Sequence, residues 1–394
     1  MAKREVVLCR PVRTAIGSFG GSLSETKVDG LGAAVITETI RRTGLDSRQI
    51  DGVIMGNVIQ AGAGMNPARQ AAIHAGLSSS IPAMTVNRVC GSGAQAVVSA
   101  ACEIIAGAAD CMVAGGMENL DRAPYLLDKA RSGYHMGNGA VIDSMLHDGL
   151  IDAFSGEHSG WHTEDLVTQY SVTRKMQDDW AVRSQSRFAH AQEAGHFDEE
   201  IFGITVRRGR DDLVFDRDEH NRPGTTSEGL SRLPAVFRKD GTITAGNAPG
   251  LNSGAAAMIV ADRAWAEANG CIPAARLVAF GIAGVEPTMF GLGPIPATRM
   301  ALERATWSVS DVERYEINEA FAAIAIAVTR ELGLPEDIVN VEGGAIAHGH
   351  PIGATGAVLV TRVIHSMKRE GLRRGVVSLC IGGGQGIALA LEVL

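Results

Sequence analysis

Two cysteines and a histidine, each in a glycine-rich turn, are the residues of this sequence best suited to covalent chemistry. Cys90 begins the run Cys-Gly-Ser-Gly, His350 lies in His-Gly-His-Pro, and Cys380 begins Cys-Ile-Gly-Gly-Gly-Gln-Gly. A thiolate is a strong nucleophile, an imidazole can remove a thiol proton, and glycine lets the backbone approach a ligand closely. These residues predict a covalent catalyst.

The pattern around Cys90 predicts a turn from a strand into a helix. Residues 84–89 are typical of a strand, and apolar residues from Val97 to Ile105 recur at helical spacing. A thiol at a helix start faces unpaired N–H groups and the positive end of the helix dipole. We therefore expect the thiolate of Cys90 to be favoured.

The second half of the chain carries three further turns of the same kind. Asn318 is expected to open a helix that stops at Gly333, and His350 precedes a helix that ends near Gly371. Cys380 closes an apolar run and is followed by a glycine loop. Reactive side chains at turns can converge on one pocket, so we expect a shared site.

Composition limits the class of protein. The chain has 394 residues, 45% of them hydrophobic and 20% charged, which is typical of a soluble globular protein with two or more domains. A net charge of -8 argues against a nucleic-acid partner, and no apolar run predicts a membrane span. The apolar run Val6–Cys9 near the start is too short for the hydrophobic core of a signal peptide and has no cleavage site, so we expect no signal peptide.

Cysteine usage predicts a reducing environment. The six cysteines form no Cys-x-x-Cys pair, so neither a zinc cage nor a disulfide framework is indicated, and we expect a cytoplasmic protein. Four of them are interpreted as inert small apolar residues: Cys9, Cys102, Cys111 and Cys271.

Short β-branched runs alternate with alanine-rich helical patterns, which predicts an α/β fold. The order of elements occurs twice: 33 positions separate Asn57 from Cys90, and 32 separate Asn318 from His350. This spacing predicts two copies of one unit facing each other. Residues 119–244 differ in character and are interpreted as an insertion, with one helix from Thr173 to about Gly195.

Two alternatives follow from isolated motifs. The run from Gly91 to Ala96 matches the dinucleotide-binding pattern G-x-G-x-x-A, but no acidic residue ends a second strand at the expected spacing. A metal site is conceivable at His158 and His162, or at His348 and His350, but neither pair has a convincing third ligand.

Five motifs, in order and over nearly the whole chain, resemble those of the thiolase family, and most closely its bacterial acetyl-CoA acetyltransferases. They are Asn87–Gly93, Gly241–Asn247, Asn318–Phe321, Gly349–Gly353 and Cys380–Gly384. The resemblance implies a duplicated, five-layered αβαβα fold with an inserted loop domain. It implies an N-terminal half at 1–118 completed by 245–270, an insertion at 119–244 for coenzyme A binding and oligomerisation, and a C-terminal half at 271–394. A homotetramer, or a dimer, is expected.

The resemblance also implies catalytic roles. Cys90 would attack an acyl-CoA, His350 would take its proton, and Cys380 would remove the α-proton of a second acyl-CoA. His350 with a water held by Asn318 would form one oxyanion hole, and the N–H groups of Cys90 and Gly382 the other. The reaction would be reversible Claisen condensation or thiolysis. Coenzyme A would be a co-substrate, with no permanently bound cofactor and no metal.

Residues for coenzyme A are likewise carried over by resemblance. Arg222 would lie near the adenine, and the other residues along the pantetheine arm: His158, Ala245, Gly246, Pro249, Ala320 and Phe321.

The chain departs from the family where the acyl pocket is expected. Ser159 replaces a usual methionine, Pro249 a serine, Ser253 an aspartate and His348 a leucine, and residues 119–121 replace a usual Ser-Met-Ser. These changes leave open a longer or branched 3-ketoacyl-CoA substrate, or a catalytically silent coenzyme A-binding protein. A decarboxylating condensing enzyme of the same fold is a further alternative, against which Cys380 argues.

Overall fold

The computed structural model describes residues 4–394; Met1 to Lys3, part of the segment expected to lack a signal peptide, lie outside this range. Strands and helices alternate along the chain, and the predicted α/β class is confirmed. The strands are β1 Val6–Arg13, β2 Gly17–Ser18, β3 Gly52–Gly56, β4 Ala83–Val86, β5 Cys111–Asn119, β6 Tyr125–Leu126, β7 Ile142–Asp143, β8 Ile204–Arg208, β9 Asp211–Phe215, β10 Asn252–Asp262, β11 Pro273–Gly284, β12 Arg314–Ile317, β13 Arg374–Ile381 and β14 Gln385–Val393.

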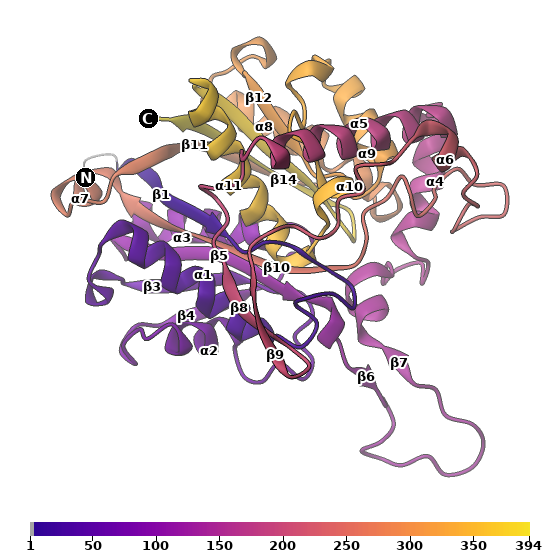
Figure 1. The fold of residues 1–394 in the computed structure, drawn as a ribbon, viewed down its shortest axis with the longest axis horizontal. Coiled ribbons are helices and arrows are strands. Elements are labelled where there is room, and N and C mark those ends of the chain that lie inside the picture. Colours follow the sequence, from indigo (N-terminus) through magenta and orange to yellow (C-terminus); the bar gives the residue numbers. More distant parts are fainter. Residues whose placement is uncertain (1–3) are drawn as a thin grey trace.

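The helices cover both faces of the sheet and the space between its two halves (Figure 1). They are α1 Val28–Thr43, α2 Pro67–His74, α3 Ser92–Ala106, α4 Ser159–Gln169, α5 Arg174–Glu193, α6 Ser227–Ser231, α7 Arg263–Ala268, α8 Pro294–Ala305, α9 Ala322–Glu331, α10 Ala345–His348 and α11 Ile352–Glu370.

The sheet topology shows the duplication that the spacing predicts. The strand order is β12-β13-β14-β11-β1-β10-β5-β3-β4, and the pairing of β1 with β11 joins the two halves. In the first half β3 is parallel to β5, which is antiparallel to β10; in the second, β12 is parallel to β13, which is antiparallel to β14. Each half therefore contains the same arrangement of parallel and antiparallel strands.

Three apolar clusters define five layers. One packs α1 and α2 on the first half of the sheet, and a second packs α8 and α9 on the other half. The third contains α3, α11 and residues from both halves of the sheet, so these two helices form the middle layer. The stretch Val89–Ala106, which includes α3, is long and apolar enough to span a membrane, but 56% of it is buried in this layer.

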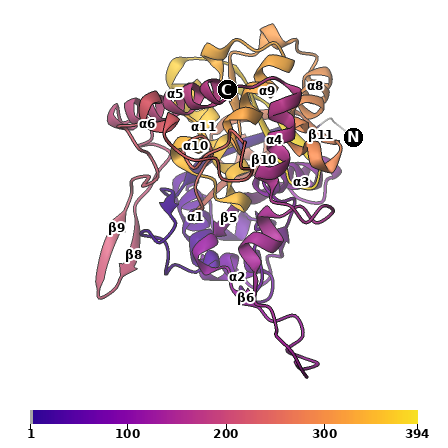
Figure 2. The same ribbon diagram turned by 90° about the vertical axis from the view of Figure 1, so that its right-hand side faces the viewer.

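The segment between β5 and β10 leaves the layered body. Figures 1 and 2 show β6 and β7 at the base of a long projecting loop, and the β8–β9 hairpin projecting separately. The predicted helix is α5, with the Thr173 hydroxyl accepting from Met176 N at 3.3 Å. The segment also contains α4, which the sequence reasoning missed because its buried positions include polar Thr163 and Glu164.

One predicted helix start is wrong. Asn318 does not open α9, because its N–H donates to Ser378 O at 2.9 Å and continues the pairing of β12 with β13. The helix begins at Ala322, after Phe321. The predicted end of α11 is confirmed: Gly371 caps it with a left-handed φ of 68°, which glycine adopts without strain.

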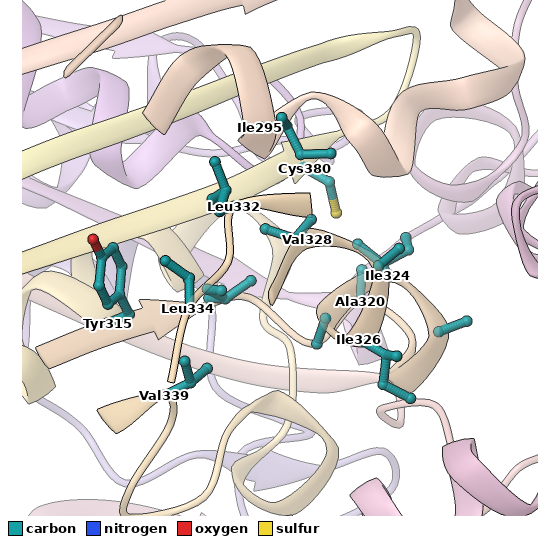
Figure 3. Close-up of a cluster of buried hydrophobic side chains, with 14 of the residues drawn as sticks. Ile295, Tyr315, Ala320, Ile324, Ile326, Val328, Leu332, Leu334, Val339 and Cys380 are labelled. Atoms are coloured by element: carbon teal, nitrogen blue, oxygen red, sulfur yellow. The ribbon is translucent and has the colours of Figure 1, made fainter. Parts of the chain in front are cut away.

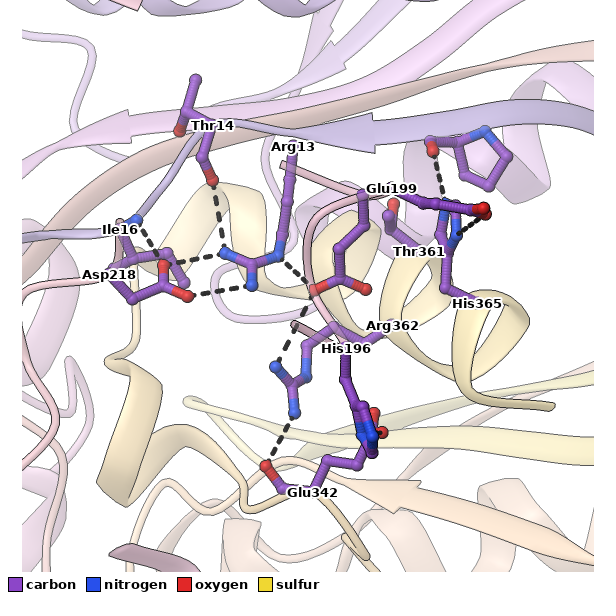
Figure 4. Close-up of polar contacts among 12 residues, drawn as sticks. Arg13, Thr14, Ile16, His196, Glu199, Asp218, Glu342, Thr361, Arg362 and His365 are labelled. Carbon is purple, nitrogen blue, oxygen red and sulfur yellow. Dashed lines mark hydrogen bonds and ion pairs between the residues drawn. The ribbon is translucent and has the colours of Figure 1, made fainter. Parts of the chain in front are cut away.

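A buried ion-pair network ties the segment between β5 and β10 to both halves (Figure 4). Arg13, at the end of β1, is fully buried; its Nε donates to Glu200 at 2.7 Å, and its two Nη atoms donate to Asp218 at 2.8 and 2.9 Å. Arg362 of α11 lies 3.9 Å from the same Glu200 carboxylate. Buried charges are tolerated only when paired in this way.

We predict that Asp218→Ala destabilises the protein by about 3–5 kcal/mol, because it leaves a buried guanidinium without a main partner. Thermal unfolding measures the loss. Glu228→Ala, which removes the exposed partner of Arg232, is the matched control and should cost under about 1 kcal/mol. Equal losses in the two variants would show that the buried pair stabilises the protein no more than the exposed pair does.

Candidate active site

A cavity of about 1150 Å³ brings together side chains from both halves of the chain. Of the residues singled out from the sequence, those that line it are Cys90, His158, Ser159, Pro249, Ala320, Phe321, His350 and Gly382. Asn318 and Cys380 are not among the lining residues. Asn318 lies beside His350, and Cys380 is close enough to Cys90 for a charge on Cys90 to raise its pKa. The turns that carry Cys90 and His350 therefore meet at one cavity, as the sequence predicts.

Cys90 lies on a strained turn between β4 and α3. Val89 has a φ of 43°, which is rare for a β-branched residue. The Asn87 side chain accepts from Val89 N at 2.9 Å, and the Ser92 hydroxyl donates to Val89 O at 2.7 Å. These polar contacts hold the strained residue and so fix the direction of the Cys90 side chain.

Burial, and not the helix start, dominates the acidity of Cys90. Burial raises the pKa of the Cys90 thiol to about 11, although the N–H groups of Gly382 and of Cys90 itself act in the opposite direction. The expectation that the thiolate is favoured is therefore wrong for this site. Burial, and then the neighbouring Cys90, raise the pKa of Cys380 well above its usual range. Both sulfurs rest as thiols at neutral pH.

His350 is held as a base with a defined tautomer. Its Nδ1 lies 2.7 Å from Thr355 Oγ1, and that hydroxyl donates its own proton to Pro351 O at 2.9 Å. The hydroxyl must therefore accept from Nδ1–H, which leaves Nε2 unprotonated. Burial lowers the pKa of His350 to about 4, so the ring is neutral at physiological pH.

Two asparagines surround His350. Asn252, at the start of β10, accepts from His350 N at 2.9 Å through its side chain, and it donates to Gly17 O at 3.1 Å. Asn318 Nδ2 lies 3.5 Å from His350 Nε2. Asn318 Oδ1 is buried and has no hydrogen-bond partner among residues 4–394, so it is free to accept from a water or a substrate group.

The two cysteines belong to different apolar clusters. Cys90 packs with an aliphatic cluster that includes Val58, Leu120, Leu150 and Ile352. Cys380 belongs to the large cluster of the second half, among the side chains of α8 and α9 (Figure 3). Each sulfur is therefore positioned by a different apolar core.

A buried carboxylate joins the loop after β3 to the start of α11, beside Cys90 and His350. Glu118, on β5, accepts from Val58 N at 3.0 Å, Ile59 N at 3.3 Å, Asn57 Nδ2 at 2.8 Å and Gly353 N at 2.9 Å. Burial raises the pKa of Glu118 to about 7, and these donors partly offset that effect. The group joins the loop after β3 to the first turn of α11, three residues after His350.

The residues assigned to coenzyme A divide into two groups. His158 stacks on Phe237 with ring centroids 4.6 Å apart, and Phe237 meets Phe321 edge-on at 5.9 Å, so these rings form one wall with Pro249 nearby. Arg222 and Ala245 are exposed, and neither they nor Gly246 line the cavity. At Gly246 a Cβ would meet Leu233 Cδ1 at 2.7 Å, so this glycine serves packing.

The described part of the chain contains no group of three or more His, Cys, Asp or Glu side chains that could hold a metal ion. His162 Nε2 is paired with Ser155 Oγ at 2.7 Å.

Sequence reasoning missed several residues that hold the site. Thr355 and Glu118 carry a weak local signal, since one lies on the first turn after His350 and the other ends a buried strand. Asn252 and Phe237 carry none, because Asn252 meets a residue 98 positions away and Phe237 lies in a loop.

Comparison with known proteins gives a consistent result. The family models for "Thiolase, N-terminal domain" and "Thiolase, C-terminal domain" match residues 6–264 and 271–393. The acetyl-CoA acetyltransferase of Cupriavidus necator is 48% identical over 98% of this chain and 99% of that protein, and that of Pseudomonas aeruginosa is 49% identical over the same shares. The crystal structure of the Bacillus anthracis acetyl-CoA acetyltransferase superposes with a TM-score of 0.98, at 42% identity and full coverage of both chains.

We predict that Thr355→Val slows acylation of Cys90 by acetyl-CoA on the order of 10²-fold, because His350 Nδ1 loses its acceptor and the basic nitrogen is no longer defined. Rapid-quench mass spectrometry measures the rate. Thr355→Ser should retain most of it. Thr361→Val removes another buried hydroxyl of α11, which donates to Ala357 O at 2.9 Å, and should leave the rate unchanged. A loss of similar size in Thr361→Val would show a packing effect instead.

We predict that His348→Leu stabilises the protein, increasingly so below pH 6.5. His348 is fully buried, and neither ring nitrogen has a hydrogen-bond partner within residues 4–394. Burial holds the pKa of His348 well below its usual value, so as pH falls through about 6.5 the unfolded chain binds a proton that the folded chain does not. With respect to this group, the free energy of unfolding is therefore highest above about pH 6.5 and decreases as the pH falls below that value.

Thermal unfolding between pH 5 and 8 measures the effect, and the gain at pH 8 should be about 1–3 kcal/mol from removing the unsatisfied polar group. A smaller gain at pH 5 than at pH 8 would contradict the sign.

Proposed function

The chain belongs to the thiolase family, and we propose that it transfers an acetyl group between two acyl-CoA molecules through an acyl-enzyme on Cys90. The reaction is thiolysis of a 3-ketoacyl-CoA by coenzyme A, or its reverse, Claisen condensation. The observation that carries the proposal is the meeting in one cavity of the Cys90 thiol, the Gly382 N–H and the unprotonated Nε2 of His350.

In thiolysis, the first step forms the acyl-enzyme. His350 Nε2 takes the Cys90 proton, and the thiolate attacks the 3-keto carbon of the substrate. The C–C bond then breaks, and the departing enolate of acetyl-CoA needs a proton. Burial keeps Cys380 protonated, so it is suited to act as this acid.

The second step returns the protons. The thiol of coenzyme A gives its proton to the Cys380 thiolate, and the resulting CoA thiolate attacks the acyl group on Cys90. Cys90 leaves as a thiolate and recovers its proton from His350. The net change consumes one coenzyme A thiol and produces two thioesters, so every proton is accounted for.

Developing negative charge requires fixed donors. The N–H groups of Cys90 and Gly382 both interact with the Cys90 sulfur. The oxyanion would form on the carbonyl oxygen of the acyl group bonded to that sulfur, within their reach. His350, once protonated, and a water held by Asn318 would supply the second set, beside the enolate oxygen. Each such donor in a dry site contributes about 2.7–4 kcal/mol to transition-state stabilisation.

Two broader expectations from the sequence remain proposals: a cytoplasmic location and a homotetramer. The oligomer is supported by apolar side chains on the loop between β6 and β7, where Leu127 is 53% and Met136 99% exposed.

We predict that Cys380→Ala lowers thiolysis of acetoacetyl-CoA by about 10²–10⁴-fold, because no group then protonates the enolate. The same variant should still form an acetyl adduct on Cys90 from acetyl-CoA, which intact-protein mass spectrometry detects. Cys102→Ala, which removes an exposed thiol of α3 outside the cavity, is the control and should keep both activities.

Absence of any adduct in the wild-type protein would favour a catalytically silent coenzyme A-binding protein. Full thiolysis in Cys380→Ala would contradict the role of Cys380 as the acid that protonates the enolate.

A further inference from the structure

The two N–H groups that would hold the acyl oxyanion come from segments far apart in the sequence. Cys90 lies on the turn into α3, and Gly382 lies in the loop Gly382–Gly384 between β13 and β14. Both N–H groups interact with the Cys90 sulfur. An oxyanion is stabilised by such donors only when each lies about 2.7–3.1 Å from it. The position of the loop relative to the turn therefore affects the rate.

The loop is fixed at its end but not at its beginning. Gly384 O accepts from Val285 N at 2.8 Å, and a Cβ on Gly384 would meet Pro287 Cα at 2.8 Å. Within residues 4–394, a Cβ on Gly383 would meet nothing within 4 Å, and one on Gly382 would meet only Val89 Cγ1, at 3.7 Å. Glycine leaves this part of the backbone free to adopt several conformations. The Gly382 N–H thus depends on contacts that cross from the Cys90 turn.

Two kinds of contact define the distance between the turn and the loop. At Gly91 a Cβ would meet Ile381 Cδ1 at 2.6 Å, so the turn already packs against the end of β13 and cannot come closer. Arg88 Nη1 donates to Gln385 Oε1 at 2.8 Å. This is the only side-chain hydrogen bond within residues 4–394 that joins residues 87–92 to the hairpin of β13 and β14. Packing limits approach, and the hydrogen bond limits separation.

Arg88 and Gln385 are close along the chain to the two N–H groups. Arg88 is two residues before Cys90, and its carbonyl oxygen accepts from Gly91 N at 2.9 Å. Gln385 is three residues after Gly382, and it pairs with Ile381 across the hairpin. A charged donor makes their hydrogen bond stronger than one between neutral groups. A shift at either partner is therefore passed on to the N–H group beside it.

We propose that Arg88 and Gln385 are positioning residues that hold the Gly382 N–H at the distance from the Cys90 N–H that the acyl oxyanion requires. Neither residue lines the cavity, so they act through the turn and the loop and not on the substrate. The inference rests on the proposed thiolase function and adds a supporting pair to it. The pair acts on the step in which the Cys90 sulfur attacks an acyl carbon and the carbonyl oxygen becomes negative.

The test measures acetylation of Cys90 by acetyl-CoA with rapid-quench mass spectrometry. Arg88→Leu and Gln385→Leu should each slow acetylation about tenfold or more, because misplacing a group by about 1 Å can cost 10²-fold in rate. The double variant should be no slower than the slower single variant, because both changes remove the same contact. Gln385→Glu keeps an acceptor for Arg88 and should retain the rate within about threefold.

Gln95→Leu is the matched control. Gln95 is half-buried in the first turn of α3, and its side chain donates to Ser99 Oγ at 2.9 Å within the same helix. Acetylation of this variant should proceed at the wild-type rate. Thermal unfolding verifies that every variant is folded.

Alkylation of Cys90 by iodoacetamide separates positioning from a general disturbance of the site. This reaction needs a reactive sulfur but displaces iodide without forming an oxyanion, so Arg88→Leu and Gln385→Leu should slow it by less than about threefold. Equal losses in acetylation and alkylation overturn the inference, as do losses that add in the double variant or an unchanged acetylation rate in both single variants. Absence of acetylation in the wild-type protein overturns the proposed function itself.

Discussion

The site depends on one buried carboxylate. Glu118 accepts hydrogen bonds from the loop that follows β3 and from the first turn of α11, so it sets the distance between the wall behind Cys90 and the segment that carries His350. Without these donors a carboxylate could not be buried at this depth. A second buried carboxylate acts in a similar way at a different place in the fold: Glu319, after β12, accepts from Trp180 Nε1, Ser184 Oγ, Asn340 Nδ2 and Ile346 N. One carboxylate joins the two halves, and the other joins α5 to the second half.

The middle layer converts this alignment into a rigid geometry. At Gly93 of α3 a Cβ would meet Ala357 N at 2.6 Å, and at Gly356 of α11 a Cβ would meet Ala94 Cβ at 2.8 Å, so the two helices cross with their backbones in contact. Because α3 follows Cys90 and α11 follows His350, this contact fixes the starts of both helices relative to each other. The nucleophile and the base are positioned by one helix pair.

Local signals in the sequence predicted much of this arrangement. Thr173 and Gly371 mark helix ends because capping depends on a few neighbouring residues, and the equal spacing before Cys90 and His350 reveals the duplication. What sequence reasoning missed depends on distant contacts. The hydroxyl of Thr355 defines a tautomer only because His350 turns back onto its own helix, and the protonation of Cys90 follows from burial by both halves. Asn318 was misplaced because pairing with β13 prevailed over its helical pattern.

The placement of the two thiols on opposite cores has an electrostatic consequence. They face each other closely enough for charge on Cys90 to raise the pKa of Cys380, and the surrounding walls offer little water to screen a second negative charge. An anion on one sulfur therefore disfavours an anion on the other. In the proposed reaction, repulsion between the two sulfurs would keep acyl transfer and carbon acid chemistry apart in time, without any moving part.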